Sequence, residues 1–124
     1  MIKKNIPQGN FVKGIIYNVS YKDNAFDLVL CLEVLEHLAF PEKAMEEIKR
    51  ISSKDILLSV PNEPLWSFLN ILRLKYLLNL GNTPAHCQRW SSNKFQNFVK
   101  KYFTIKAVKK VMPWTIIFCS GGKE

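Results

Sequence analysis

The sequence feature that most constrains the fold is a largely apolar run, Phe26–Leu32, in which only Asp27 is polar and which leads directly into three ionisable side chains. The run follows Asp23-Asn24, a pair of residues typical of turns. Apolar runs of this length are typical of strands buried on both faces inside a parallel sheet. Ligands of open α/β sheets bind beyond the carboxyl ends of such strands, so we expect this junction to be the functional centre.

A helix and a second strand follow the junction. Pro41 suits the first position of a helix, because its missing N–H costs nothing there. Apolar residues then recur at helical spacing, at Ala44, Met45, Ile48 and Ile51. Asp55–Val60 is a second apolar strand, which Pro61 ends. Strand, helix and strand in this order predict a parallel pair with a right-handed crossover, which brings the tip of the second strand beside Glu33.

The other face of the predicted helix is charged. Lys43–Glu47 and Glu46–Arg50 are opposite-charge pairs at i,i+4 spacing, and each is expected to add roughly a few tenths of a kcal/mol. We interpret these charges as a solvated helix face without a function.

Shorter elements flank this unit. Phe11–Tyr17 is a candidate for a short strand. Ser91 is a suitable N-cap for a helix that buries Phe95, Phe98, Val99 and Tyr102. Thr104–Val111 and Trp114–Cys119 are two further strands, and the short link between them requires an antiparallel pair.

The segment Leu65–Leu80 is predicted to form a helix that is apolar nearly all round. It is too short, and with Arg73 and Lys75 too charged, to span a bilayer. Three interpretations stay open. The helix could be a lid over a hydrophobic substrate, an anchor for peripheral membrane contact, or a helix packed against its own domain or a partner.

Composition limits the class of protein. With 124 residues, 48% of them hydrophobic, the chain fits one folded domain. The net charge of +8 suits an anionic partner, although many basic proteins have none. The lysines are spread rather than striped and no recognised module is present, so we expect no specific nucleic acid. Cys31, Cys87 and Cys119 are odd in number and widely spaced, and residues 1–7 lack the apolar core of a signal peptide, so a reducing, cytoplasmic location is expected.

Several segments, in this order, resemble the class I S-adenosylmethionine-dependent methyltransferases of the methyltransferase type 11 kind, and most closely the ubiquinone- and menaquinone-biosynthesis enzymes. The matching segments are Asp23–Val29, Val34–Leu38, Pro61-Asn62 and Arg89-Trp90-Ser91, followed by the antiparallel hairpin. The resemblance covers nearly all of residues 11–120. It implies an α/β fold, with a partial Rossmann-like class I methyltransferase sheet of parallel strands, a C-terminal antiparallel hairpin and helices on both faces. Residues 1–124 would form a single truncated domain in which Leu65–Leu80 is a helical insertion.

The family's glycine-rich loop and the acidic residue that follows it have no match here, and Ile15 stands where the family tends to carry an acid. In the family's strand order, 3-2-1-4-5-7-6, the chain would supply strands 4, 5, 7 and 6. The segment Phe11–Tyr17, which corresponds to strand 3 of the family, would then have no neighbouring strand in the sheet. The strand Phe26–Leu32 would be an open apolar edge. The resemblance therefore implies a second chain that supplies the N-terminal half-sheet, or a homodimer through the exposed edge. It also implies that the isolated chain binds S-adenosylmethionine very weakly or not at all.

The resemblance also implies site residues. Cys31, Leu32 and Glu33 correspond to the end of the fourth strand, which lines the cofactor cleft largely through its backbone. Glu33, Glu36 and His37, which would share one face of a helix, match the ligand pattern of small-RNA 2′-O-methyltransferases, with His86 as a fourth ligand for a divalent metal. The alternative is that a carboxylate near a helix start interacts with the helix dipole alone.

The implied activity is S-adenosylmethionine-dependent methyl transfer to a small, hydrophobic or lipid-linked acceptor, governed by alignment of donor and acceptor. The sequence contains no identifiable nucleophile–base pair. His86 is the best candidate for a base, and an ordinary loop histidine is the alternative. A second class stays open: a non-catalytic methyltransferase remnant that acts as a protein- or membrane-interaction module through Leu65–Leu80.

Overall fold

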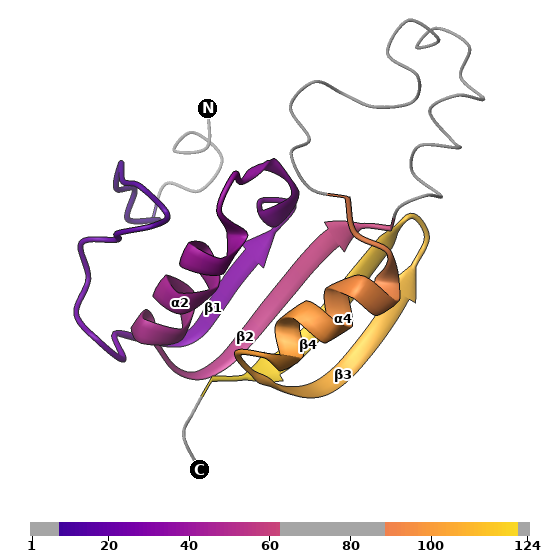
Figure 1. Ribbon diagram of the computed structural model, residues 1–124. Helices are drawn as coiled ribbons and strands as arrows, with labels where there is room; N and C mark the ends of the chain where they lie inside the picture. Colours follow the sequence, from indigo (N-terminus) through magenta and orange to yellow (C-terminus); the bar gives the residue numbers. More distant parts are fainter. Residues whose placement is uncertain (1–7, 63–88, 122–124) are drawn as a thin grey trace, which may run out of the picture.

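The computed structural model describes residues 8–62 and 89–121, which form one sheet with helices packed against it (Figure 1). The four strands are β1 (Phe26–Leu32), β2 (Ser52–Pro61), β3 (Thr104–Val111) and β4 (Trp114–Ser120). Their order in the sheet is β1-β2-β4-β3. β1 and β2 are parallel, whereas β4 is antiparallel to both of its neighbours. The parallel pair, the closing hairpin and the half-sheet order predicted from the sequence are therefore confirmed.

Three helical segments accompany the sheet: the short 3-10 helix η1 (Leu35–His37), α2 (Pro41–Ile51) and α4 (Ser92–Lys100). Pro41 is the first residue of α2, as expected. The Ser91 side chain caps α4 by accepting a hydrogen bond from the Lys94 N–H at 3.2 Å. Both longer helices cover the same face of the sheet (Figure 1). The expectation of helices on both faces is thus met on one face only within residues 8–62 and 89–121.

The hydrophobic core lies between that face and the two helices. Strand residues that alternate along the chain, such as Ile56 and Leu58 of β2, point into it because successive side chains of a strand face opposite ways. Helix α2 buries Met45 and Ile48, and α4 buries Phe95. The amphipathic spacing read from the sequence therefore identified the buried side of each helix.

The opposite face of the sheet is apolar and open. Leu28, Leu30 and Leu32 of β1 are 53%, 57% and 44% exposed. Leu30 pairs with Leu57 of β2, which pairs in turn with Phe118 of β4, so one apolar row crosses three strands. The prediction that Phe26–Leu32 is buried on both faces is wrong for the described residues, because only one face carries helices. The sheet order leaves β1 as an edge strand, as the resemblance implied.

The segment before β1 is not a strand. Within the predicted strand Phe11–Tyr17, only an isolated bridge joins Ile15 to Asn18, closed by the Asn18 N–H donating to the Ile15 carbonyl at 3.0 Å. This segment turns back on itself and pairs with no neighbouring strand among the described residues. Strand β2 in turn begins at Ser52, earlier than expected, because the chain enters it directly from α2.

The predicted helix Leu65–Leu80 lies outside the described residues. Among the helices that the structure does describe, none is long and apolar enough to cross a bilayer.

Candidate functional site

The candidate site lies where β1 and β2 end, and Glu33 and Ser59 define its geometry. Glu33 has a φ of 57°, a left-handed conformation that turns the chain away from the sheet. Its N–H donates to the Ser59 carbonyl at 3.1 Å, and the Ser59 hydroxyl donates to Glu33 Oε1 at 2.9 Å. Both strand tips are therefore fixed by one pair of residues. The sequence correctly predicted that the tip of β2 lies beside Glu33. Ser59 was not among the predicted site residues, although a hydroxyl near the end of an otherwise apolar strand could have indicated it.

Glu36 is a buried acid next to this pair. It is 2% exposed, its Oε1 lies 3.6 Å from His37 Nε2, and its Oε2 has no hydrogen-bond partner among the described residues. Burial raises the pKa of Glu36 above its usual 4.5. A hydrogen bond from its own backbone offsets part of this rise in pKa, and the nearby Glu33 carboxylate adds to it. Glu36 is therefore biased toward its neutral form.

The predicted metal set is not formed by its described members. The 3-10 helix begins at Leu35, so Glu33 does not share a helix face with Glu36 and His37 as the spacing suggested. Within residues 8–62 and 89–121, no group of three His, Cys, Asp or Glu side chains is placed to hold a metal ion. The left-handed turn at Glu33, which directs its carboxylate to Ser59, is the physical reason. His86, the predicted fourth ligand and candidate base, lies outside the described residues.

The predicted cofactor residues differ in what they can offer. Cys31 faces the core and is 5% exposed, and burial, with a further contribution from Glu36, raises the pKa of its thiol to about 12. It can therefore contribute only its backbone to a ligand site. Leu32 is 44% exposed on the open sheet face, and Glu33 is half-buried at the turn. The three residues lie together at the end of β1, and the described chain places no glycine of its own beside them.

A small apolar cavity of about 200 Å³ lies between β1, α2 and the segment before β1. Val29, Leu30 and Cys31 of β1 form one side, and Ile16 and other residues form the rest. Its further lining residues are Val19, Val34, Glu47, Ile48 and Ile51. Since the cavity borders an edge strand, a chain segment paired with β1 could place apolar side chains into it.

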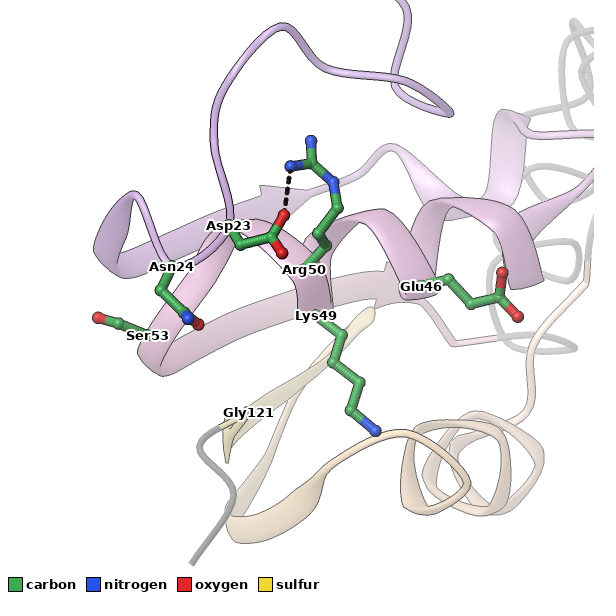
Figure 2. Close-up of a pocket in the computed structure, with 7 residues that line it drawn as sticks. All are labelled: Asp23, Asn24, Glu46, Lys49, Arg50, Ser53 and Gly121. Atoms are coloured by element: carbon green, nitrogen blue, oxygen red, sulfur yellow. Dashed lines mark hydrogen bonds and ion pairs between the residues drawn. The ribbon is translucent and has the colours of Figure 1, made fainter.

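A larger cavity of about 720 Å³ lies at the opposite end of the sheet, where α2 ends and β2 begins (Figure 2). Arg50 dominates its chemistry. The guanidinium pairs with Glu47 at 2.6 Å and with Asp23 at 3.0 Å, and it donates to the carbonyls of Tyr21 and Val19. The predicted pairing of Arg50 with Glu46 is wrong, whereas Glu46 and Lys49 are exposed to solvent as predicted for this helix face. Arg50 instead fastens the segment before β1 to α2.

Parts of the sequence match a known protein family and a known protein. Residues 1–58 match the family model for a methyltransferase domain. A segment of 36 residues is 56% identical to the uncharacterized protein MJ0638 of Methanocaldococcus jannaschii. The aligned segment covers 29% of this chain and 16% of that protein.

Solved structures are similar over nearly the whole chain. The PH0226 protein of Pyrococcus horikoshii has a TM-score of 0.68 at 17% identity, covering 96% of this chain and 63% of its own. A SAM-dependent methyltransferase of Aquifex aeolicus has a TM-score of 0.67 at 11% identity, covering 96% and 59%. Magnesium protoporphyrin IX methyltransferase of Synechocystis, solved with bound SAH, has a TM-score of 0.63 at 16% identity, covering 95% and 55%. The chain thus spans less than two thirds of the length of each of these structures. These likenesses confirm the fold that the resemblance implied.

Proposed function

We propose that this chain, whose fold is that of the class I S-adenosylmethionine-dependent methyltransferases, forms one wall of the cofactor cleft in a methyl transfer to a small, hydrophobic or lipid-linked acceptor. The observation that carries the proposal is the sheet order β1-β2-β4-β3, with β4 antiparallel between its two neighbours, together with the match of residues 1–58 to the methyltransferase domain. The proposed location is the reducing cytoplasm, which the free, buried thiols of Cys31 and Cys119 support.

Within this proposal, the residues of the chain position rather than react. The cofactor, when bound, supplies an activated methyl group. The backbone of Cys31, Leu32 and Glu33 would line the cleft, and the two hydrogen bonds between Glu33 and Ser59 keep that backbone at one position relative to β2. Such fixed placement is what a reaction governed by alignment requires.

The open edge of β1 is the proposed place where the sheet continues. A second chain that supplies the N-terminal half-sheet would pair with β1, fill the cavity lined by Val29 and Ile16, and cover the leucine row. A homodimer through the same edge is the alternative partner. The proposed cofactor site is complete only when the cleft has its second wall.

Calorimetric titration with S-adenosylhomocysteine tests the proposal. We expect no micromolar binding to the chain alone. We expect micromolar binding when the chain is co-purified with the product of the reading frame directly upstream, if that product contains a glycine-rich GxGxG segment. Absence of binding in both samples would contradict cofactor-dependent function. Micromolar binding to the chain alone would support the cofactor and exclude the need for a second half.

A second candidate function, a non-catalytic interaction module, is favoured by the exposure of Leu28, Leu30 and Leu32. In this function the chain has the same fold but binds no cofactor, and its exposed apolar surface contacts a protein or a membrane. The contact segment predicted from the sequence for this function is Leu65–Leu80, so this candidate predicts sedimentation with anionic vesicles that is lost when Leu69 and Leu72 of that segment become Asp. It also predicts that neither the chain nor its complex binds S-adenosylhomocysteine.

A further inference from the structure

Two shallow grooves, one beside α4 and one at its C-terminal end, share the lining residue Lys101. The first, of about 290 Å³, is lined by Arg89, Trp90, Lys94 and Lys101, among others. The second, of about 260 Å³, is lined by Lys49, Lys100 and Lys101, together with the turn into β3. In Figure 2 the Lys49 side chain extends away from Arg50 toward the end of α4, so α2 contributes a cation to the second groove. We refer to these two grooves, which share Lys101, together as the basic track.

The track is strongly positive. It carries five exposed cations, and no Asp or Glu lines either groove. These cations are Lys49, Arg89, Lys94, Lys100 and Lys101. None of them forms an ion pair with a described residue, whereas Arg50 and Lys106 are both paired with carboxylates. Glu46 shares the adjoining cavity with Lys49. Burial raises the pKa of Tyr102, which lines the second groove, and Glu42 and Glu46 are close enough to its hydroxyl to add to that rise. Unpaired cations that outnumber the acids near them favour a ligand with several negative charges.

An aromatic side chain lies in the same track. Trp90 lines the first groove and packs on Phe98, with ring centroids 4.7 Å apart and planes inclined at 38°. Its indole Nε1 has no hydrogen-bond partner among the described residues. Proteins that bind single-stranded nucleic acids combine aromatic side chains with nearby cations, because bases stack on the aromatic rings while phosphates pair with Lys and Arg.

The shape of the track favours a flexible chain of phosphates over a single phosphate ion or a flat bilayer. Lys94, Asn97 and Lys101 lie on one face of α4 and its end, at successive turns that rise about 5.4 Å each. A flexible chain of phosphates can follow such a row through both grooves. A free phosphate ion would need converging donors at one point, and a flat bilayer would not enter two concave grooves.

We propose that this basic track binds single-stranded nucleic acid independently of its sequence. This binding does not depend on the cofactor site, which lies at the ends of β1 and β2. It agrees with the absence of a sequence-specific recognition module, because the contacts go to phosphates and to the faces of bases rather than to base edges.

Fluorescence anisotropy with a labelled single-stranded oligouridylate tests the proposal. The double variant Lys94→Glu, Lys101→Glu is compared with Lys109→Glu, Lys110→Glu, which makes the same charge change at exposed positions of β3. We expect the α4 variant to weaken binding about tenfold or more and to reduce the salt slope by roughly 1.4, since two phosphate contacts, each worth about 0.7 on a single strand, are lost. We expect the β3 variant to bind nearly as the parent does.

A Trp90→Leu variant separates stacking from charge. We expect it to weaken oligouridylate binding but not the binding of inorganic polyphosphate, which has no bases to stack. Equal weakening by the α4 and β3 variants would show only general attraction to a basic protein and would contradict the proposal. So would absence of oligouridylate binding, or binding to phosphatidylglycerol vesicles that exceeds it and depends on the same lysines.

Discussion

Glu33 and Ser59 are joined by two hydrogen bonds at the ends of the parallel strands, one between backbones at 3.1 Å and one between side chains at 2.9 Å. The pair follows directly on the last register pair of β1 and β2, Leu32 with Ser59. It closes the parallel ladder at the place where the proposed cofactor wall begins. The positive φ of Glu33 is the local strain that this closure requires.

Ser59→Ala tests the stabilising role of this pair. Ser59 is 5% exposed, and its loss removes a side-chain hydrogen bond to a carboxylate, so we expect the free energy of unfolding to fall by about 1–2 kcal/mol. Ser53→Ala is the matched control, because Ser53 bonds Asp27 at 2.9 Å near the other end of the same strands in a more exposed position. Urea denaturation of both variants gives the comparison, and an equal effect of the two would contradict a special role for Ser59.

Glu36→Gln tests the buried acid. Because the folded pKa of Glu36 is raised above 4.5, the folded chain holds its proton more tightly than the unfolded chain, and stability falls as pH rises from about 4.5 through the folded pKa. Glutamine stays neutral, so we expect the variant to lose this fall and to be more stable by on the order of 1 kcal/mol at neutral pH. The pH dependence of stability in parent and variant is measured by thermal melts between roughly pH 4 and pH 8, the range in which carboxylates and histidines titrate. A parallel pH dependence of parent and variant would contradict the assignment.

Leu58→Ala and Leu30→Ala test which face of the sheet is covered. Leu58 is fully buried under the helices, so its truncation is expected to cost about 2–5 kcal/mol. Leu30 is 57% exposed, and its truncation is expected to cost less than about 1 kcal/mol. Chemical denaturation of the isolated chain distinguishes the two. A large cost at Leu30 would mean that another part of the chain covers the open face.

Arg50→Ala tests the attachment of the segment before β1. Arg50 holds Asp23, Tyr21 and Val19 to α2, so its removal is expected to increase the rate of proteolytic cleavage between residues 15 and 24 several-fold. Lys49→Ala, at the neighbouring exposed position, is the control. Unchanged cleavage in Arg50→Ala would show that other contacts hold the segment.

Acid should loosen the same attachment. The Arg50 hydrogen bond is the largest cause that lowers the pKa of Glu47 below its usual 4.5. A group whose folded pKa is lowered stabilises the fold above its unfolded pKa and loses that contribution as pH falls through the folded pKa. We therefore expect cleavage between residues 15 and 24 to increase below about pH 4.5 in the parent, and this increase to be smaller in Glu47→Gln.

Local sequence signals predicted the helices and most of the sheet. Pro41 and Ser91 marked helix starts correctly, since each acts through backbone groups one turn away. Two apolar runs with a helix between them predicted the parallel pair, and the short link at Met112-Pro113 predicted the antiparallel one. These features depend on residues close in sequence, so spacing alone is enough to read them.

The site depended on contacts between residues far apart in the chain. Ser59 lies 26 residues beyond Glu33, and Asp23 lies 27 residues before Arg50, so helical spacing pointed to the wrong partners for both. Lysines that are spread along the sequence, Lys49 and Lys101 among them, gather only when α2 and α4 pack on one face.

The sequence by itself determined the four strands and the helices α2 and α4, although not the absence of a strand at Phe11–Tyr17, because periodicity and capping are local properties. Only the tertiary structure decided which sheet face is covered, where the carboxylates point and which cations share a groove. Those outcomes follow from the packing of elements across the whole sheet, and local spacing does not encode that packing.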